Sequence, residues 1–270
     1  MRMKKFLNLA CGDHFINSSK WTNCDFAPQS SIVEHADLSK KFPYSSNYFD
    51  LVYCSHYIEH IQIKRVTFFL DECFRVLRNG GLIRLVLPDF ENIVREYIKN
   101  IDSENLEFAS FNITELIDQC TRSNSGGKLQ DWYDSLKGNE KLTNYIYLRM
   151  GYKHKSQSIN NSVRNRLKRI TLRKLIIKIQ SRYSQFIILL LPKWFRFNHI
   201  SQIATGERHY WVHDFNSIQK LLELSGFTDI KKVDASYSSE GEFECNPLDL
   251  NQQSFPRKGL ESMFIEARKV

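Results

Sequence analysis

Side chains able to move a proton gather at two places in the sequence. Residues 55–60 read SHYIEH and contain His56, Glu59 and His60, and His209 follows much later in RHYW. Free imidazole has a pKa of about 6.5, so a histidine near neutral pH can take the proton of a hydroxyl group. His209 is the leading candidate for such a catalytic base, because it lies just before a helix where the chain rejoins its sheet; His56 and His60 are the others. Local packing or capping is the competing interpretation for each.

A turn and two carboxylates form a second candidate site. Gly12 closes the apolar run KKFLNLACG and is the one glycine in the stretch ACGDH. A dinucleotide fingerprint has GxGxxG at this place, so a diphosphate would be poorly bound here. Asp25 and Asp37 follow the next two apolar segments. Each feature alone is more often an ordinary turn or a solvated carboxylate, but their order along the chain indicates a ligand site at the carboxyl ends of successive strands.

The elements that must position these residues alternate between strand and helix. Val66, Phe69, Leu70, Cys73, Phe74 and Leu77 have helical spacing within residues 62–78, and Asn79-Gly80-Gly81 is expected to end that helix. Right-handed crossovers between such elements give an α/β fold with a doubly wound, mostly parallel sheet. The expected strands lie within residues 4–12, 21–28, 31–38, 49–61 and 82–90.

The C-terminal part of the chain is expected to complete the same sheet. Residues 214–225 read as a capped helix ended by Gly226, and residues 228–237 and 260–270 read as two final strands, an antiparallel pair at one side of the sheet. The chain then divides into a core at 1–97, a helical insertion at 98–205 and a completion of the core at 206–270.

The insertion is strongly basic. Between Glu140 and Glu207 there are 14 Lys and Arg residues and no Asp or Glu. Residues 162–185 mix basic and apolar side chains, and the apolar, tryptophan-containing segment FIILLLPKWFRF follows. This pattern is typical of a helix that lies on an anionic membrane surface, within residues 162–197. The favoured interpretation is nevertheless an ordinary helical lobe that covers a substrate pocket with its charges in solvent; membrane contact ranks second and a nucleic-acid contact last.

At this point the sequence resembles the class I S-adenosylmethionine-dependent methyltransferases. LNLACG is similar to their first motif, and the block from FDLVYCSHYIEHI to LRNGGLIRLVLPD is similar to the fourth strand, helix and fifth strand of the members often labelled type 11. GERHYWVHDFNSIQKLLELSGF and RKGLESMFIEARKV resemble a bacterial subgroup. The resemblance implies a Rossmann-like, seven-stranded sheet with a helical insertion.

The same resemblance implies a pocket for S-adenosyl-L-methionine. Asp25 matches the residue that accepts from both ribose hydroxyls, and Asp37 matches the residue that accepts from the adenine amine. Asn8 and Ala10 depart from the usual acidic residue and first glycine, although Asn8 can still orient the loop by hydrogen bonding. The expected cofactor-binding residues are Asn8, Ala10, Cys11, Gly12, Asp25, Asp37, Leu38, Cys54, Ser55 and His56.

The sequence lacks two motifs that mark particular methyl acceptors, and this limits the kind of molecule that can receive the methyl group. Cys54-Ser55-His56-Tyr57 replaces the Asn/Asp-Pro-Pro-aromatic turn of enzymes that methylate nucleobase amines, and no Pro-Cys dipeptide occurs. The subgroup implies oxygen methylation of a sugar or a related, phosphate-bearing small acceptor in surface glycan biosynthesis. An RNA methyltransferase and a non-catalytic methyltransferase-like binding protein stay open as alternatives.

Cysteine spacing and hydropathy indicate what to expect of metal sites, membrane spans and localisation. The six cysteines stand singly, without the cysteine–histidine spacing of zinc sites, so we expect reduced thiols and no metal site. No run approaches the 18–20 apolar residues, roughly, of a membrane span, and the N-terminus does not read as a signal peptide. We therefore expect a cytoplasmic protein, with peripheral contact at the inner face of the membrane as an option.

Overall fold

The computed structural model describes residues 2–136, 138–151, 182–184, 186–193, 195–196 and 207–270. Residues 162–181, which carry most of the expected basic helix, lie outside the described residues. Within the described residues, no helix is long and apolar enough to cross a membrane.

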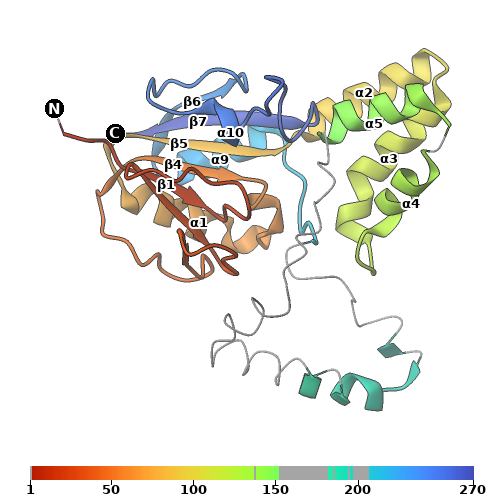
Figure 1. Ribbon diagram of the computed structural model, residues 1–270, viewed down its shortest axis with the longest axis horizontal. Coiled ribbons are helices and arrows are strands. Elements are labelled where there is room, and N and C mark those ends of the chain that lie inside the picture. Colours follow the sequence, from red (N-terminus) through yellow and green to blue (C-terminus); the bar gives the residue numbers. More distant parts are fainter. Residues whose placement is uncertain (1, 137, 152–181, 185, 194, 197–206) are drawn as a thin grey trace.

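A single seven-stranded sheet organises the described chain (Figure 1). Its order is β3-β2-β1-β4-β5-β7-β6; all neighbouring pairs are parallel except β5 with β7 and β6 with β7. The strands are β1 (Phe6–Leu9), β2 (Trp21–Asp25), β3 (Val33–His35), β4 (Phe49–Ser55), β5 (Leu77–Pro88), β6 (Phe227–Val233) and β7 (Ser262–Lys269). The predicted doubly wound sheet is confirmed, and so is the antiparallel C-terminal pair.

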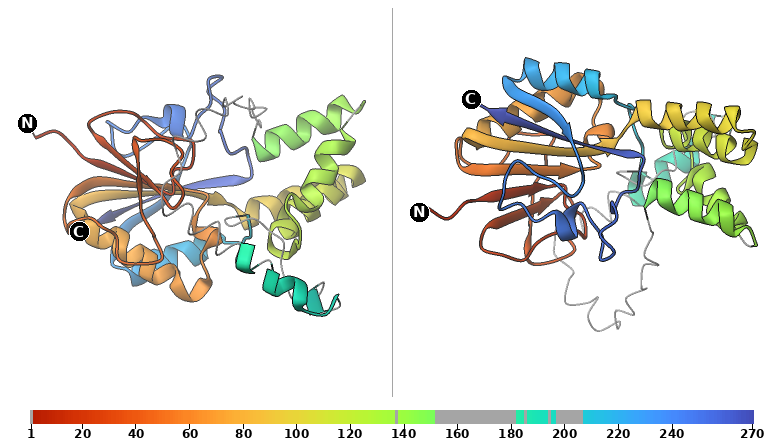
Figure 2. Two further views of the ribbon diagram at one scale, coloured as in Figure 1. Left: turned by 60° about the horizontal axis from the view of Figure 1, so that its bottom comes forward. Right: turned by 90° about the horizontal axis from the view of Figure 1, so that it is seen from above.

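Apolar contacts on both faces hold this sheet. On one face, α1 (Ile63–Val76) and α9 (Phe215–Leu224) bury Leu70 and Leu222 against the strands (Figure 2). On the other face, the segment around α10 (Cys245–Leu248) places Phe243 and Leu248 over Phe6 and neighbouring strand residues. Parallel strands covered on both faces are mostly apolar, and β1 is buried at all four positions with Asn8 as its one polar residue.

One local expectation was wrong. The helix α1 ends at Val76 rather than at Asn79, because Leu77 already has extended backbone angles and pairs with Phe49 of β4. Gly80 and Gly81 therefore belong to the start of β5, where Gly80 has a φ of 77°. The apolar side chain of Leu77 fits a buried strand position as well as a helical one, so its spacing did not distinguish them.

A separate group of helices follows β5 and stands beyond the carboxyl ends of the parallel strands (Figures 1 and 2). Its own small core contains Phe111, Leu129, Leu142 and Ile146. The helices are α2 (Phe90–Asp102), α3 (Leu106–Thr121), α4 (Gly127–Ser135) and α5 (Glu140–Met150). We call α2 to α5 the helical lobe. Because α2 begins directly after β5, the lobe is placed next to the edge where the predicted site residues lie.

The cap of α9 gives a first testable expectation. Asp214 accepts from the Ser217 N–H at 2.8 Å, and the Ser217 hydroxyl in turn accepts from the Asp214 N–H at 3.2 Å. Asp214→Ala is expected to lower the free energy of unfolding by about 0.5–2 kcal/mol. The Ser217 hydrogen bonds lower the pKa of Asp214, so this difference should be present above pH of about 4 and shrink as pH falls through the depressed value. Urea unfolding of both proteins at several pH values measures it; equal stability of the two at neutral pH would contradict it.

Candidate functional site

The turn after β1 leaves space beside its backbone at the edge of the sheet. Ala10 and Gly12 have φ angles of 50° and 53°, and a Cβ at Gly12 would meet no atom within 4 Å. The Cys11 N–H donates to the Cys24 carbonyl at 3.1 Å, which holds the turn against β2. Asn8 donates through Nδ2 to the His14 carbonyl at 3.0 Å, so it ties down the far end of the turn from inside the sheet. This is the orienting contact expected of Asn8.

Asp25 faces this turn from the end of β2. Its Oδ2 accepts from the Gly12 N–H at 3.0 Å, and its Oδ1 accepts from the Ala27 N–H at 2.8 Å. A carboxylate has about four acceptor positions, so the two N–H groups leave capacity for two further donors. The cradle therefore fits a ligand that offers a pair of hydroxyl groups, as a ribose does.

Asp37 lies on the neighbouring loop but does not share this arrangement. The Ala36 N–H donates to the Asp25 carbonyl at 3.0 Å, which places the two loops side by side. The Asp37 carboxylate accepts from the Ser39 N–H and hydroxyl and pairs with Lys40 at 3.0 Å. The Ser39 and Lys40 contacts lower the pKa of Asp37 to about 2. Its hydrogen bonds and ion pair stay within its own turn, and none joins it to Gly12.

The end of β4 supplies the third segment. The Cys54 side chain is buried in the core, so only the backbone of Cys54 faces the edge of the sheet. Ser55 is half-buried. His56 has a φ of 50°, a strained value for a residue with a Cβ, and its N–H donates to the Val86 carbonyl at 2.7 Å. Its Nε2 lies 2.9 Å from the Ser262 hydroxyl of β7. The sheet thus fixes the His56 ring at the junction of β4, β5 and β7.

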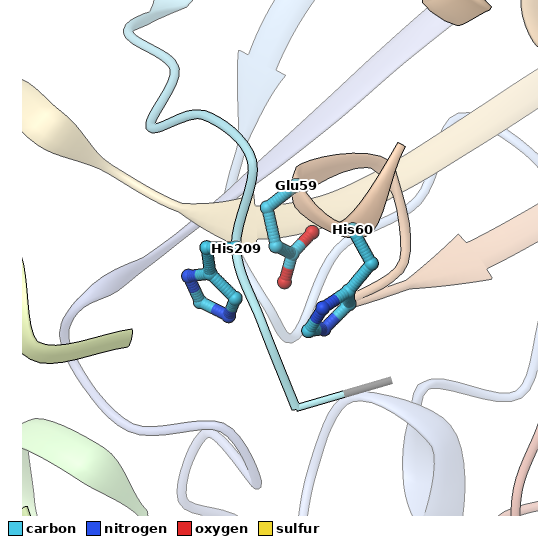
Figure 3. Close-up of side chains that lie close together, drawn as sticks. All are labelled: Glu59, His60 and His209. Carbon is cyan, nitrogen blue, oxygen red and sulfur yellow. The ribbon is translucent and has the colours of Figure 1, made fainter. Parts of the chain in front are cut away.

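A compact group of Glu59, His60 and His209 lies just beyond this strand end (Figure 3). One side-chain donor atom from each residue lies within 4.8 Å of the others. Glu59 is 1% exposed, and within the described residues neither of its carboxylate oxygens has a hydrogen-bond partner. His56 Nδ1 is 3.2 Å from Glu59 Oε1, an ion-pair distance without hydrogen-bond geometry. We call Glu59, His60 and His209 the His–Glu cluster.

Backbone contacts bring His209 to this place from far along the chain. The His209 N–H donates to the Gln119 carbonyl of α3 at 3.0 Å, and the Tyr210 N–H donates to the Glu59 carbonyl at 2.8 Å. His60 Nδ1 donates to the Arg208 carbonyl at 2.8 Å, and the His60 and His209 rings meet edge to face at 4.7 Å. The returning segment is therefore bound both to the 3-10 turn η1 (Ile58–His60) and to the helical lobe.

Burial controls the charges at this cluster. It lowers the pKa of His209 to about 3 and that of His56 to about 4, so both imidazoles are neutral at physiological pH. Burial alone would raise the pKa of Glu59, but the surrounding His56, His60 and His209 outweigh it and lower that pKa to about 2. The result is one buried carboxylate among imidazoles, of which His56 and His209 are neutral.

A pocket of about 280 Å³ connects this cluster to the Asp37 loop. Leu38 and Ser39 line one side, and Tyr57, His60 and Tyr210 line another. His209 is not among its lining residues, since its ring packs behind His60. A small ligand in this pocket would contact His60 directly.

Two further residues near the cluster escaped the sequence analysis. Burial, reinforced by the charge of Arg257, lowers the pKa of Lys258 to about 8, and Lys258 also feels the charge of Glu59. His213 is 1% exposed, and neither of its ring nitrogens has a partner within the described residues. His213 stands two residues after the RHYW segment and Lys258 four residues before β7, and spacing alone does not distinguish either from a surface residue.

Part of the chain is similar to a known protein family. Residues 15–85 match the family model described as Methyltransferase domain. The match spans Asp25, Asp37 and residues 56–60, whereas the Gly12 turn precedes it. No curated protein sequence matches the chain.

Several solved structures align with nearly the whole chain. A SAM-dependent methyltransferase from Archaeoglobus fulgidus is 12% identical, with 98% of this chain and 86% of that chain covered and a TM-score of 0.39. One from Thermotoga maritima is 10% identical, with coverage of 100% and 84% and a TM-score of 0.43. One from Mesorhizobium loti is 14% identical, with coverage of 98% and 90% and a TM-score of 0.39.

The family match runs from before β2 into β5, and these strands belong to the seven-stranded, mostly parallel sheet that the resemblance implied. The Asp25 cradle fits the ribose of the cofactor that this family uses. Residues 15–85 are therefore similar to a methyltransferase domain and lie within a Rossmann-like sheet, which indicates an S-adenosylmethionine-dependent methyltransferase with S-adenosylmethionine as its cofactor.

Proposed function

We propose that this methyltransferase methylates a hydroxyl oxygen of a small acceptor, a sugar or related unit used in surface glycan biosynthesis. The observation that carries the proposal is the 280 Å³ pocket, which has the Leu38 loop on one side and His60 on another. Oxygen methylation requires removal of a hydroxyl proton, and the His–Glu cluster provides imidazoles for this step. The sugar identity follows from the subgroup resemblance alone.

In this proposal one group of residues binds the cofactor and another activates the acceptor hydroxyl. Asp25 and the Gly12 turn hold the ribose, and Asn8 keeps the turn in place from inside the sheet. The bound cofactor supplies a methyl group on a sulfonium centre. His60 faces the acceptor in the pocket, while His209 and Glu59 fix its environment. Alignment of the two reactants by such a site lowers the barrier by about 7–11 kcal/mol.

Incubation with isotopically labelled cofactor tests this proposal. Sugar nucleotides, lipid-linked sugars, purified glycans and total RNA are offered separately, and products are followed by mass spectrometry. We expect one labelled methyl group on a sugar hydroxyl. Label in RNA with a steep salt dependence would support the RNA alternative instead. Cofactor binding with no transfer to any of these acceptors would favour a non-catalytic binding protein.

We also propose that the insertion makes peripheral contact with an anionic membrane. Phe186, Leu189 and Leu190 are 59%, 64% and 68% exposed, although all three are large and apolar. They follow the acid-free basic stretch, in which eight Lys and Arg residues lie between positions 164 and 182. Apolar insertion next to basic charge is the combination that binds an anionic leaflet, at about 1 kcal/mol for each basic residue.

Vesicle sedimentation measures this contact. The protein is expected to sediment with vesicles that contain phosphatidylserine and to remain in solution with pure phosphatidylcholine. Leu189→Ser with Leu190→Ser should reduce sedimentation several-fold, whereas Leu224→Ser, which changes a leucine on α9 that is 77% exposed, should not. Failure of the unaltered protein to bind the anionic vesicles at low salt would refute the contact.

A further inference from the structure

The His–Glu cluster has the donor set of a metal site. It offers two imidazole nitrogens and one carboxylate oxygen within 4.8 Å of one another. On a tetrahedral Zn²⁺, ligand bonds are about 2.0–2.2 Å, so two ligand atoms stand about 3.3–3.6 Å apart. Small rotations of the side chains would close the difference. Two nitrogens and one oxygen suit Zn²⁺ and similar transition metals better than Mg²⁺ or Ca²⁺, which prefer oxygen ligands alone.

The state of Glu59 points independently to a cation. Its carboxylate is 1% exposed, and both oxygens lack a hydrogen bond within the described residues. An unpaired buried carboxylate costs several kcal/mol in folded proteins, so such groups are normally paired, hydrogen-bonded or bound to a metal. Within the described residues, the ion-pair contact of Glu59 is with His56 and not with Lys or Arg, although Lys258 also interacts with its charge. A divalent ion between Glu59 and the imidazoles of the cluster would compensate the charge.

The hydrogen bond of His60 prepares its other nitrogen for coordination. A carbonyl only accepts, so Nδ1 of His60 must carry the proton that it donates to Arg208. In the neutral ring this leaves Nε2 with a free lone pair. Metal-binding histidines commonly have such a partner on the second nitrogen, which fixes the tautomer and the ring orientation. The contacts of the His209 and Tyr210 N–H groups likewise hold the His209 backbone in place.

We propose that Glu59, Nε2 of His60 and His209 bind one divalent transition-metal ion of the Zn²⁺ type, with an open coordination position toward the pocket. Its role rests on the proposed oxygen methylation: the acceptor hydroxyl would coordinate at the open position, and the metal would lower its pKa. With Nε2 of His60 on the metal, this ring acts as a ligand in place of a base, so the O–H bond breaks and the proton passes to water. The oxygen then forms the new bond to the methyl carbon, and the carbon–sulfur bond breaks to leave a neutral thioether.

Metal titration tests the site without reference to turnover. Protein stripped with a chelator is titrated with Zn²⁺ by calorimetry and with Co²⁺ by visible absorption. We expect one ion per chain. Glu59→Gln and His209→Gln should each weaken binding by more than about 100-fold, since even loss of an outer-shell partner costs about 10- to 100-fold. His35→Gln and Glu91→Gln change an exposed histidine and an exposed glutamate, and both should bind as the unaltered protein does. Unchanged binding in both cluster variants, or no binding by the stripped protein, would overturn the proposal.

Two controls separate this inference from the proposed function. Thermal unfolding and cofactor calorimetry of each variant show whether the fold and the Asp25 cradle are intact. Metal binding at the cluster without methyl transfer to any hydroxyl acceptor would leave the site standing and remove the proposed function. Full turnover by metal-free protein would keep the proposed function and remove the catalytic role of the metal.

Discussion

Asp25→Ala is expected to weaken S-adenosylmethionine binding by about 10²- to 10⁴-fold. The carboxylate has room for two more hydrogen bonds beyond those from Gly12 and Ala27, and the ribose hydroxyls would fill it. Each hydrogen bond to a charged group contributes about 1.5–3 kcal/mol, and about 1.4 kcal/mol corresponds to a factor of ten in affinity. Loss of the carboxylate also releases the Gly12 N–H, so the turn loses its support from β2. Titration calorimetry measures the affinity.

Asp13→Ala is the matched control, because Asp13 is an exposed carboxylate next to Gly12. It should change the affinity little. Asp37→Ala tests whether the Asp37 carboxylate binds the adenine group. A small change in cofactor affinity agrees with a carboxylate that bonds only within its own turn. A loss of affinity as large as that of Asp25→Ala would mean that this turn rearranges when the cofactor binds. An Asp25→Ala protein that folds and binds the cofactor normally would rule out the cradle.

His60→Ala is expected to lower kcat by about 10²- to 10⁴-fold, with little change in cofactor affinity. His60 lines the acceptor pocket, whereas Asp25 and Gly12 lie at the other strand ends. A positioned proton acceptor contributes about this range of rate. His209→Ala should cause a similar loss, since its ring packs against His60 and shares Glu59. Steady-state kinetics with the acceptor found by mass spectrometry provides the measurement.

The double variant of His60 and His209 is informative because residues that act as one unit are not additive. It should lose scarcely more activity than either single variant. Multiplication of the two single effects would show that the histidines act separately. If His209→Ala alone kept full activity, His209, the leading candidate of the sequence analysis, would have no part in the activation.

The sheet could be predicted from the sequence because its signals are local. The central parallel strands are largely apolar runs, and α9 begins after the Asp214 cap and ends at Leu224, two residues before Gly226. The Gly12 turn and Asp25 could also be predicted, since both come directly after strands whose carboxyl ends share one edge. The resemblance to a known family then gave these positions a ligand.

Contacts between distant segments could not be predicted. Arg84 lies in the middle of the apolar strand β5, and its buried guanidinium is paired with Asp249 and Glu266, both far along the chain. The His–Glu cluster has the same character, because His209 returns to Glu59 only through backbone contacts with α3 and η1. Sequence spacing reveals a metal site only when its ligands stand close together in the chain, whereas the fold brings Glu59, His60 and His209 together from two distant segments.

A crystal structure with S-adenosylhomocysteine tests the central claim most directly. The account predicts that both ribose hydroxyls lie within hydrogen-bonding distance of the Asp25 carboxylate, with the sulfur directed toward His56 and the pocket lined by His60. A ligand bound elsewhere, with the Asp25 carboxylate still bonded only to the N–H groups of Gly12 and Ala27, would contradict it.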